Sequence, residues 1–159
     1  MATTTATTTG PATQLTFSSQ PDPNFYDQVV QHPDLSWTAV QRPLTDTTYT
    51  NPMLGDHIDL GVRSRLKLRV DSFANNQIAS IAPTQTQVAA NTTIAQLGAL
   101  PPASLTPVQS SQLAAAQALT NKIQATNNFA HQVKMDIDNI LTFDDALNWQ
   151  MPVGWPPVV

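Results

Sequence analysis

Residues 106–141 read TPVQSSQLAAAQALTNKIQATNNFAHQVKMDIDNIL, and this stretch decides the expected fold. Thr106 suits a helix N-cap, Pro107 suits the first helical position, and Gln109 completes a Thr-x-x-Gln capping box. Apolar or small residues then recur at steps of three and four: Ala116, Leu119, Ile123, Thr126, Ala130, Val133, Ile137 and Ile140. This heptad seam predicts one long helix over residues 107–141, roughly 50 Å in length.

The seam is expected to pack against other chains. Three of its eight positions are Ala or Thr, so facing helices can approach closely but each contact buries little apolar area. Such a seam needs several partners to be stable. Its larger residues are therefore candidate interface residues: Leu119, Ile123, Val133 and Ile137.

The segment before the long helix carries no charge. Residues 72–121 contain no Asp, Glu, Lys or Arg, and dispersed charge is what normally keeps a protein monomeric. Within the segment, residues 86–97 predict a short helix that Gly98 and the Pro101–Pro102 pair bring to an end.

Residues 56–82 fit two patterns. Residues 57–71 alternate apolar and polar side chains as a strand does, yet Ile58, Val62, Leu66, Val70 and Phe73 also lie on one helical stripe. We favour a helix capped by Asp56 and weakened by Gly61, because 15 residues is long for a strand, whose usual range is about 3–10. Both alternatives stay open for residues 57–71.

The N-terminal third is expected to be extended. Residues 1–22 are rich in Thr, which predicts a flexible arm, and prolines interrupt residues 23–55 about every ten residues. A short helix over 23–31, with Asp22 as its N-cap, is one possibility. The rest of this segment is expected to place aromatic anchors on a surface, with Trp37 and Tyr49 as candidates.

The C-terminal end combines a short helix with an apolar tail. Residues 142–145 form a second capping box, so a short helix is expected to lead up to Trp149. The tail, residues 151–159, is rich in proline and carries Trp155, and an apolar tail of this kind is expected to dock on a surface.

Together these patterns predict a mainly α fold. It would be a helical bundle or a coiled-coil-like long helix, with an extended N-terminal arm and a Pro-rich C-terminal tail. The expected segments are a Thr-rich arm over 1–22, a Pro-punctuated extended segment over 23–55, a helical domain over 56–150 and the tail over 151–159.

The composition argues against several classes of function. The net charge of −4 argues against nucleic acid as the main partner. The chain has no cysteine, so thiol chemistry and Cys-based zinc sites are excluded. The N-terminus resembles no secretory signal, and no apolar run approaches the ~18 residues of a membrane span.

No candidate catalytic, cofactor-binding or metal-binding residues emerge. His57 and Asp59 are spaced as two ligands could be, but a metal site needs more convergent ligands, and a solvated capping cluster explains them. Asp144 and Asp145 suit the first turn of a helix. Arg63, Arg65, Lys67 and Arg69 are four of seven basic residues, and we interpret them as a belt of salt bridges between subunits.

Residues 89–97, AANTTIAQL, and 105–125, LTPVQSSQLAAAQALTNKIQA, resemble small virion proteins of tailed bacteriophages, which also have a short helix, a Thr-Pro turn and a Gln/Ala-rich helix. The resemblance implies a structural role, assembly in the host cytoplasm and location in the virion. The expected partners are copies of the chain itself and other virion proteins, in a homo-oligomer, with no cofactor and no membrane. The alternative is a scaffolding or chaperone-like adaptor that binds one partner through its helix and tail.

Overall fold

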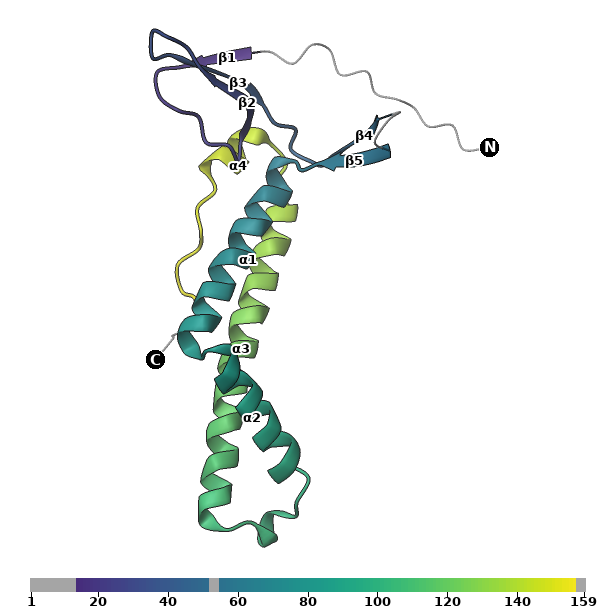
Figure 1. Ribbon diagram of the computed structural model, residues 1–159, viewed down its shortest axis with the longest axis vertical. Coiled ribbons are helices and arrows are strands. Elements are labelled where there is room, and N and C mark those ends of the chain that lie inside the picture. Colours follow the sequence, from purple (N-terminus) through teal and green to yellow (C-terminus); the bar gives the residue numbers. More distant parts are fainter. Residues whose placement is uncertain (1–13, 52–54, 157–159) are drawn as a thin grey trace, which may run out of the picture. The chain divides into compact units, whose positions relative to one another are not determined.

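The computed structural model describes residues 14–51 and 55–156, without the side chains of residues 49–57. These residues form two compact units. The first contains residues up to Leu66 together with Leu141–Asn148, and the second contains Lys67–Ile140 and the residues from Trp149 onward. Helix α1, Val62–Ile81, begins in the first unit and continues into the second (Figure 1).

The first unit is built on antiparallel strands. Strands β1 (Gln14–Phe17), β3 (Trp37–Gln41) and β2 (Tyr26–Gln31) form a three-stranded sheet in the order β1-β3-β2. Strands β4 (Thr47–Asn51) and β5 (Gly55–Asp59) pair as a separate two-stranded sheet. The prediction of a mainly α fold is therefore wrong: the chain is mixed α/β, because the segments between the prolines pair with one another instead of remaining single and extended.

The helix considered over residues 23–31 is also wrong. Asp22 does start a turn, since its carbonyl oxygen accepts hydrogen bonds from the Phe25 and Tyr26 amides, both at 3.0 Å. The next carbonyl needed for a helix, that of Pro23, instead accepts from Arg42 Nε at 3.0 Å, and the Phe25 carbonyl accepts from the Arg42 amide at 2.9 Å. A β-bulge follows at Gln28, whose φ is 48°, and the chain continues as β2.

Aromatic side chains fill the space beside the first sheet. Phe143 of helix α4 (Phe143–Asn148) contacts Phe25 and Tyr26 edge to face, with ring centroids 6.2 and 5.8 Å apart. Phe17 and Tyr26 make a third such pair at 4.8 Å. Thr142 caps α4, because its hydroxyl accepts a hydrogen bond from the Asp145 amide at 3.1 Å. The short helix predicted after the second capping box is therefore confirmed.

Residues 56–82 divide between the two patterns that the sequence shows. Residues up to Asp59 form strand β5, and the helix starts only at Val62, not at Asp56. The Gly61 amide donates to Asp46 Oδ1 at 2.8 Å, and the Val62 and Arg63 amides donate to the carbonyls of Pro43 and Leu44. Backbone carbonyls of the loop between β3 and β4 thus satisfy the first amides of α1, which a side-chain cap would otherwise do.

The second unit is helical. It contains most of α1, then α2 (Thr84–Leu97), a 3-10 turn (Pro102–Ser104) and α3 (Pro107–Asp138). The long helix predicted over 107–141 is present but ends three residues earlier, and both hydrogen bonds of its Thr106–Gln109 capping box are formed. The short helix predicted over 86–97 is confirmed, with a start two residues earlier.

Two ion pairs and an aromatic cluster join α1, α3 and the C-terminal tail. Lys67 pairs with Asp138, and Lys134 Nζ lies 2.7 Å from Asp71 Oδ1. The Trp155 ring lies between Phe73 of α1 and Phe129 of α3, with centroid distances of 4.9 Å to each. The expectation that the tail docks is met within the same chain.

Of the predicted N-terminal arm, residues 1–13 lie outside the described residues, and the four residues from Gln14 to Phe17 form β1.

Candidate functional site

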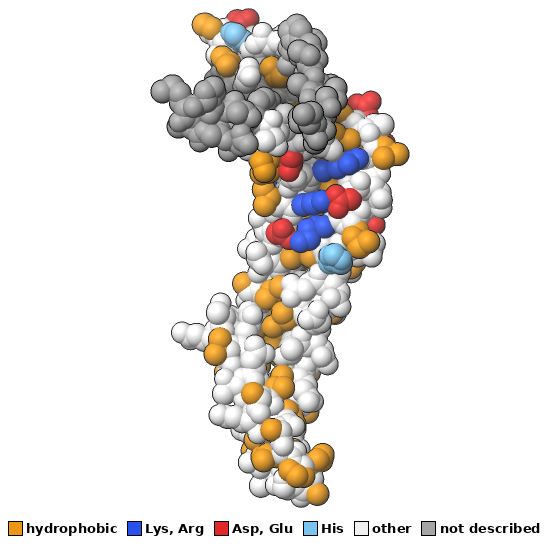
Figure 2. Space-filling model, turned by 90° about the vertical axis from the view of Figure 1, so that its right-hand side faces the viewer, with side chains coloured by type: hydrophobic (Ala, Val, Ile, Leu, Met, Phe, Trp, Pro, Cys, Tyr) orange, Lys and Arg blue, Asp and Glu red, His pale blue; other side chains and the backbone are white. Residues whose placement is uncertain are grey.

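The second unit contains a helical hairpin without charged side chains. Helices α2 and α3 lie side by side (Figure 1), and residues 84–121, which we call the neutral arm, comprise α2, the 3-10 turn and the first half of α3. Figure 2 shows a group of Lys, Arg and Asp side chains above the neutral arm in that view. The surface of the neutral arm below them is uncharged. Assembly surfaces are often depleted of charge at their centre, so the neutral arm is our candidate functional site.

The contact between α2 and α3 leaves its own large apolar residues incompletely covered. Of the neutral arm, only the small residues Ala90 and Ala116 fall into the buried class. The larger residues on the facing sides remain partly exposed: Ile94, Leu97, Leu113 and Leu119, followed by Ile123 just beyond the arm. The hairpin therefore has the pattern of a core without enough partners to cover it.

The same seam is fully covered farther along α3. Ala130, Val133 and Ile137 are at most 4% exposed, in the region where ion pairs join α3 to α1. The two halves of α3 therefore differ in how many elements cover the seam. Val133 and Ile137, predicted as contacts with other chains, are buried within this chain, whereas Leu119 and Ile123 remain partly accessible.

The four basic residues of α1 do not form one face. Lys67 pairs with Asp138, and Arg65 Nε donates to the Leu60 carbonyl at 3.3 Å. Arg69 is exposed, and Arg63 is partly exposed near the start of the helix. Of these four residues, Lys67 forms a salt bridge, but with a residue of its own chain. A belt of salt bridges between subunits stays a prediction.

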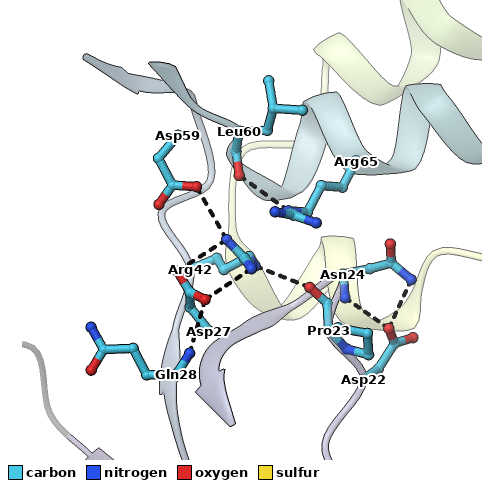
Figure 3. Close-up of polar contacts among 9 residues, drawn as sticks. All are labelled: Asp22, Pro23, Asn24, Asp27, Gln28, Arg42, Asp59, Leu60 and Arg65. Atoms are coloured by element: carbon cyan, nitrogen blue, oxygen red, sulfur yellow. Dashed lines mark hydrogen bonds and ion pairs between the residues drawn. The ribbon is translucent and has the colours of Figure 1, made fainter. Parts of the chain in front are cut away.

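Arg42 is a polar centre that sequence reasoning missed. Its side chain is only 8% exposed, and it joins three segments of the first unit (Figure 3). Nε donates to the Pro23 carbonyl at 3.0 Å, Nη2 lies 3.1 Å from Asp27 Oδ1, and Nη1 lies 3.3 Å from Asp59 Oδ1. A lone Arg before a proline gives no local signal of this role, which depends on the pairing of distant strands.

The aromatic candidates lie in different places. Trp37 is partly exposed on β3, opposite Phe17 of β1, and Trp149 is partly exposed after α4. Tyr49 lies on β4, opposite His57, and its side chain is outside the described residues. Trp155 packs inside the second unit, as described above. Trp37 and Tyr49 therefore belong to the first unit, whereas Trp149 and Trp155 belong to the second.

The remaining polar candidates have local structural roles. His32 Nε2 lies 2.9 Å from Thr38 Oγ1, His131 is exposed on α3, and Asp145 takes part in the cap of α4. Within the part of the chain that the structure describes, no group of three or more His, Cys, Asp or Glu side chains is arranged to hold a metal ion.

No protein-family model, curated protein or solved structure matches this chain. Within the described residues, no helix has both the length and the apolar character needed to cross a membrane.

Proposed function

We propose that this chain is a structural protein that assembles through packing between subunits. The observation that carries the proposal is the neutral arm, an uncharged helical hairpin in which Leu113 and Leu119 of α3 remain partly exposed. The seam of the same helix is buried farther along, at Val133 and Ile137. A solvent-facing hairpin of this kind gains stability when another helix covers it, because apolar burial contributes about 25 cal/mol per Å².

The charged groups of the described residues support a structural role over catalysis. Arg42, Lys67 and Lys134 are each engaged with carboxylates of the same chain, in positions that hold segments together. Each such arrangement explains its residues without any substrate. We therefore propose that the chain is not an enzyme and that its activity is association.

The location that we propose is the virion of a tailed bacteriophage, as part of its tail, baseplate, neck or capsid decoration. This part of the proposal rests on the resemblance of residues 89–97 and 105–125 to small virion proteins, and these residues cover most of the neutral arm. The proposed partners are other copies of the chain and neighbouring virion proteins.

The alternative, a scaffolding or chaperone-like adaptor, was expected to bind through the long helix and the tail. Trp155 of the tail lies between Phe73 and Phe129 of its own chain, so the tail already has a binding place within the chain. That packing favours a built-in structural component over an adaptor whose tail must reach a partner.

The test is to quantify this chain by mass spectrometry in purified particles from the producing culture, together with assembly intermediates. We expect many copies in mature particles. Its presence in intermediates with loss from mature particles would identify the scaffolding alternative. Absence from both would contradict a virion role, whatever the oligomeric state of the purified chain.

A further inference from the structure

We propose that the neutral arms of two copies of this chain pair with each other and form a four-helix bundle. The inference rests on the proposed assembly function and deepens it, because it names the partner and the surface. Each copy would contribute α2 and the first half of α3. The contact would centre on one face of α3, made of Val108, Gln112, Ala115 and Leu119, which we call the outer face.

The outer face follows from helical spacing. Its residues are separated by steps of four, three and four, so they lie in one row along α3. Val108 is 66% exposed, Ala115 is exposed and Leu119 is partly exposed. The buried Ala116 directly follows Ala115, and a step of one residue turns the helix by about 100°, so the outer face adjoins the side that packs on α2.

Two faces at this angle are what a bundle requires. In a four-helix bundle each helix contacts two neighbours, and the neighbours lie in directions roughly 90° apart. Helix α2 supplies one neighbour of α3 within the chain. The outer face provides for the second neighbour, and Leu119 lies between the two, where both contacts would cover it.

The charge distribution favours a second copy as the occupant. Each chain carries a net charge of −4, and all of its charged residues lie outside residues 72–121. Two copies repel each other least where neither has charge, so arm against arm is the favourable approach. A partner with a charged surface would instead lose hydration at its charges without receiving a counter-charge from the arm.

A two-fold arrangement then covers the same surface on both copies. In such a contact each outer face meets the equivalent region of the other chain, so one row of residues suffices. Gln112, in the middle of the row, carries a side-chain amide that is both donor and acceptor and can therefore pair with its own equivalent. The small Ala115 beside it permits close approach of the helices.

The experiment is sedimentation equilibrium of the full chain over a range of concentrations. The test variant is Val108→Lys with Ala115→Lys, since both positions are exposed and the monomer should fold unchanged, as circular dichroism would verify. The matched control is Leu141→Lys, a residue 79% exposed outside the arm. We expect a concentration-dependent dimer whose Kd rises on the order of 100-fold in the test variant and stays unchanged in the control, because like charges would face each other across the contact.

Hydrogen exchange of the unmodified chain at low and high concentration provides a second measurement. Amides of residues 84–121 should exchange more slowly at high concentration, while those of the first unit should not change. A chain that stays monomeric at its solubility limit would overturn the proposal, as would a dimer that the test variant does not weaken. Neither result would remove the chain from virions, so the broader function would stand or fall on the particle measurement alone.

Discussion

Gly61 lies between strand β5 and helix α1, directly against the backbone of Thr45. A Cβ added there would be 2.3 Å from the Thr45 carbonyl carbon, and that atom cannot move aside as a flexible side-chain end could. We therefore expect Gly61→Ala to lower the free energy of unfolding by about 2–3 kcal/mol, measured by urea denaturation. Ser72→Ala, an exposed change within α1, is the control. A loss below about 0.5 kcal/mol, within the range of ordinary surface substitutions, would contradict this view of the junction.

Leu35 lies at the tip of the β2–β3 hairpin in the left-handed backbone region, with a φ of 66° and 71% of its surface exposed. Beside it, the Ser36 hydroxyl and amide donate to Asp34 Oδ1 at 2.7 and 3.1 Å, and these hydrogen bonds hold the pKa of the Asp34 carboxyl below its ordinary value. The left-handed conformation costs an L-residue roughly 1–2 kcal/mol, whereas Asn tolerates it well.

Leu35→Asn should accordingly raise the free energy of unfolding by about 0.5–1 kcal/mol, seen as a higher midpoint of thermal unfolding. The same change at Leu141 is the control, since that residue is also exposed and its φ is not positive. Equal effects at the two positions would mean that exposure of an apolar side chain, and not backbone strain, is responsible.

At the scale of elements, the capping box of α3 is a local device with a local effect. The Gln109 amide donates to Thr106 Oγ1 at 3.2 Å, and the Thr106 amide donates to Gln109 Oε1 at 2.9 Å. Thr106→Ala should therefore cost about 1 kcal/mol. Hydrogen exchange should locate the loss in the first turn of α3, with the amides near Ile137 unchanged. Faster exchange along all of α3 would mean that the helix opens as a single unit.

The elements that could be predicted from the sequence are those with local signals. Helix α3 has its cap at Thr106, a proline at its first position and a periodic seam, all within a few turns of chain. Strand β2 has none of these, because its pairing depends on β3 and on the Arg42 amide, which takes the Phe25 carbonyl away from a helix. The apolar-polar alternation runs through residues 57–71, but the strand ends at Asp59 and a helix follows from Val62. The sequence does not show where the strand ends, because the contact of Gly61 with Thr45 at that point is also non-local.

The candidate site follows the same rule. The lack of charge over residues 72–121 is visible in the sequence, and it is the property that defines the neutral arm. Which large seam residues remain accessible was not predictable, since Val133 and Leu119 have equivalent positions in the heptad pattern. Only the placement of the other elements around α3 leaves one buried and the other partly exposed.

For the whole molecule, the separation of charged and uncharged surface has a consequence for how association responds to salt. If copies pair through the neutral arm, no ion pair forms at the contact, and the only long-range electrostatic effect is repulsion between chains of net charge −4. Salt screens that repulsion over a Debye length of about 10 Å at 0.1 M. Raising NaCl from low ionic strength should therefore leave the dimer Kd unchanged or lower it slightly, as measured by sedimentation equilibrium. A Kd that rises tenfold or more would place ion pairs at the contact and would point to the basic residues of α1, Arg69 first among them because it is exposed.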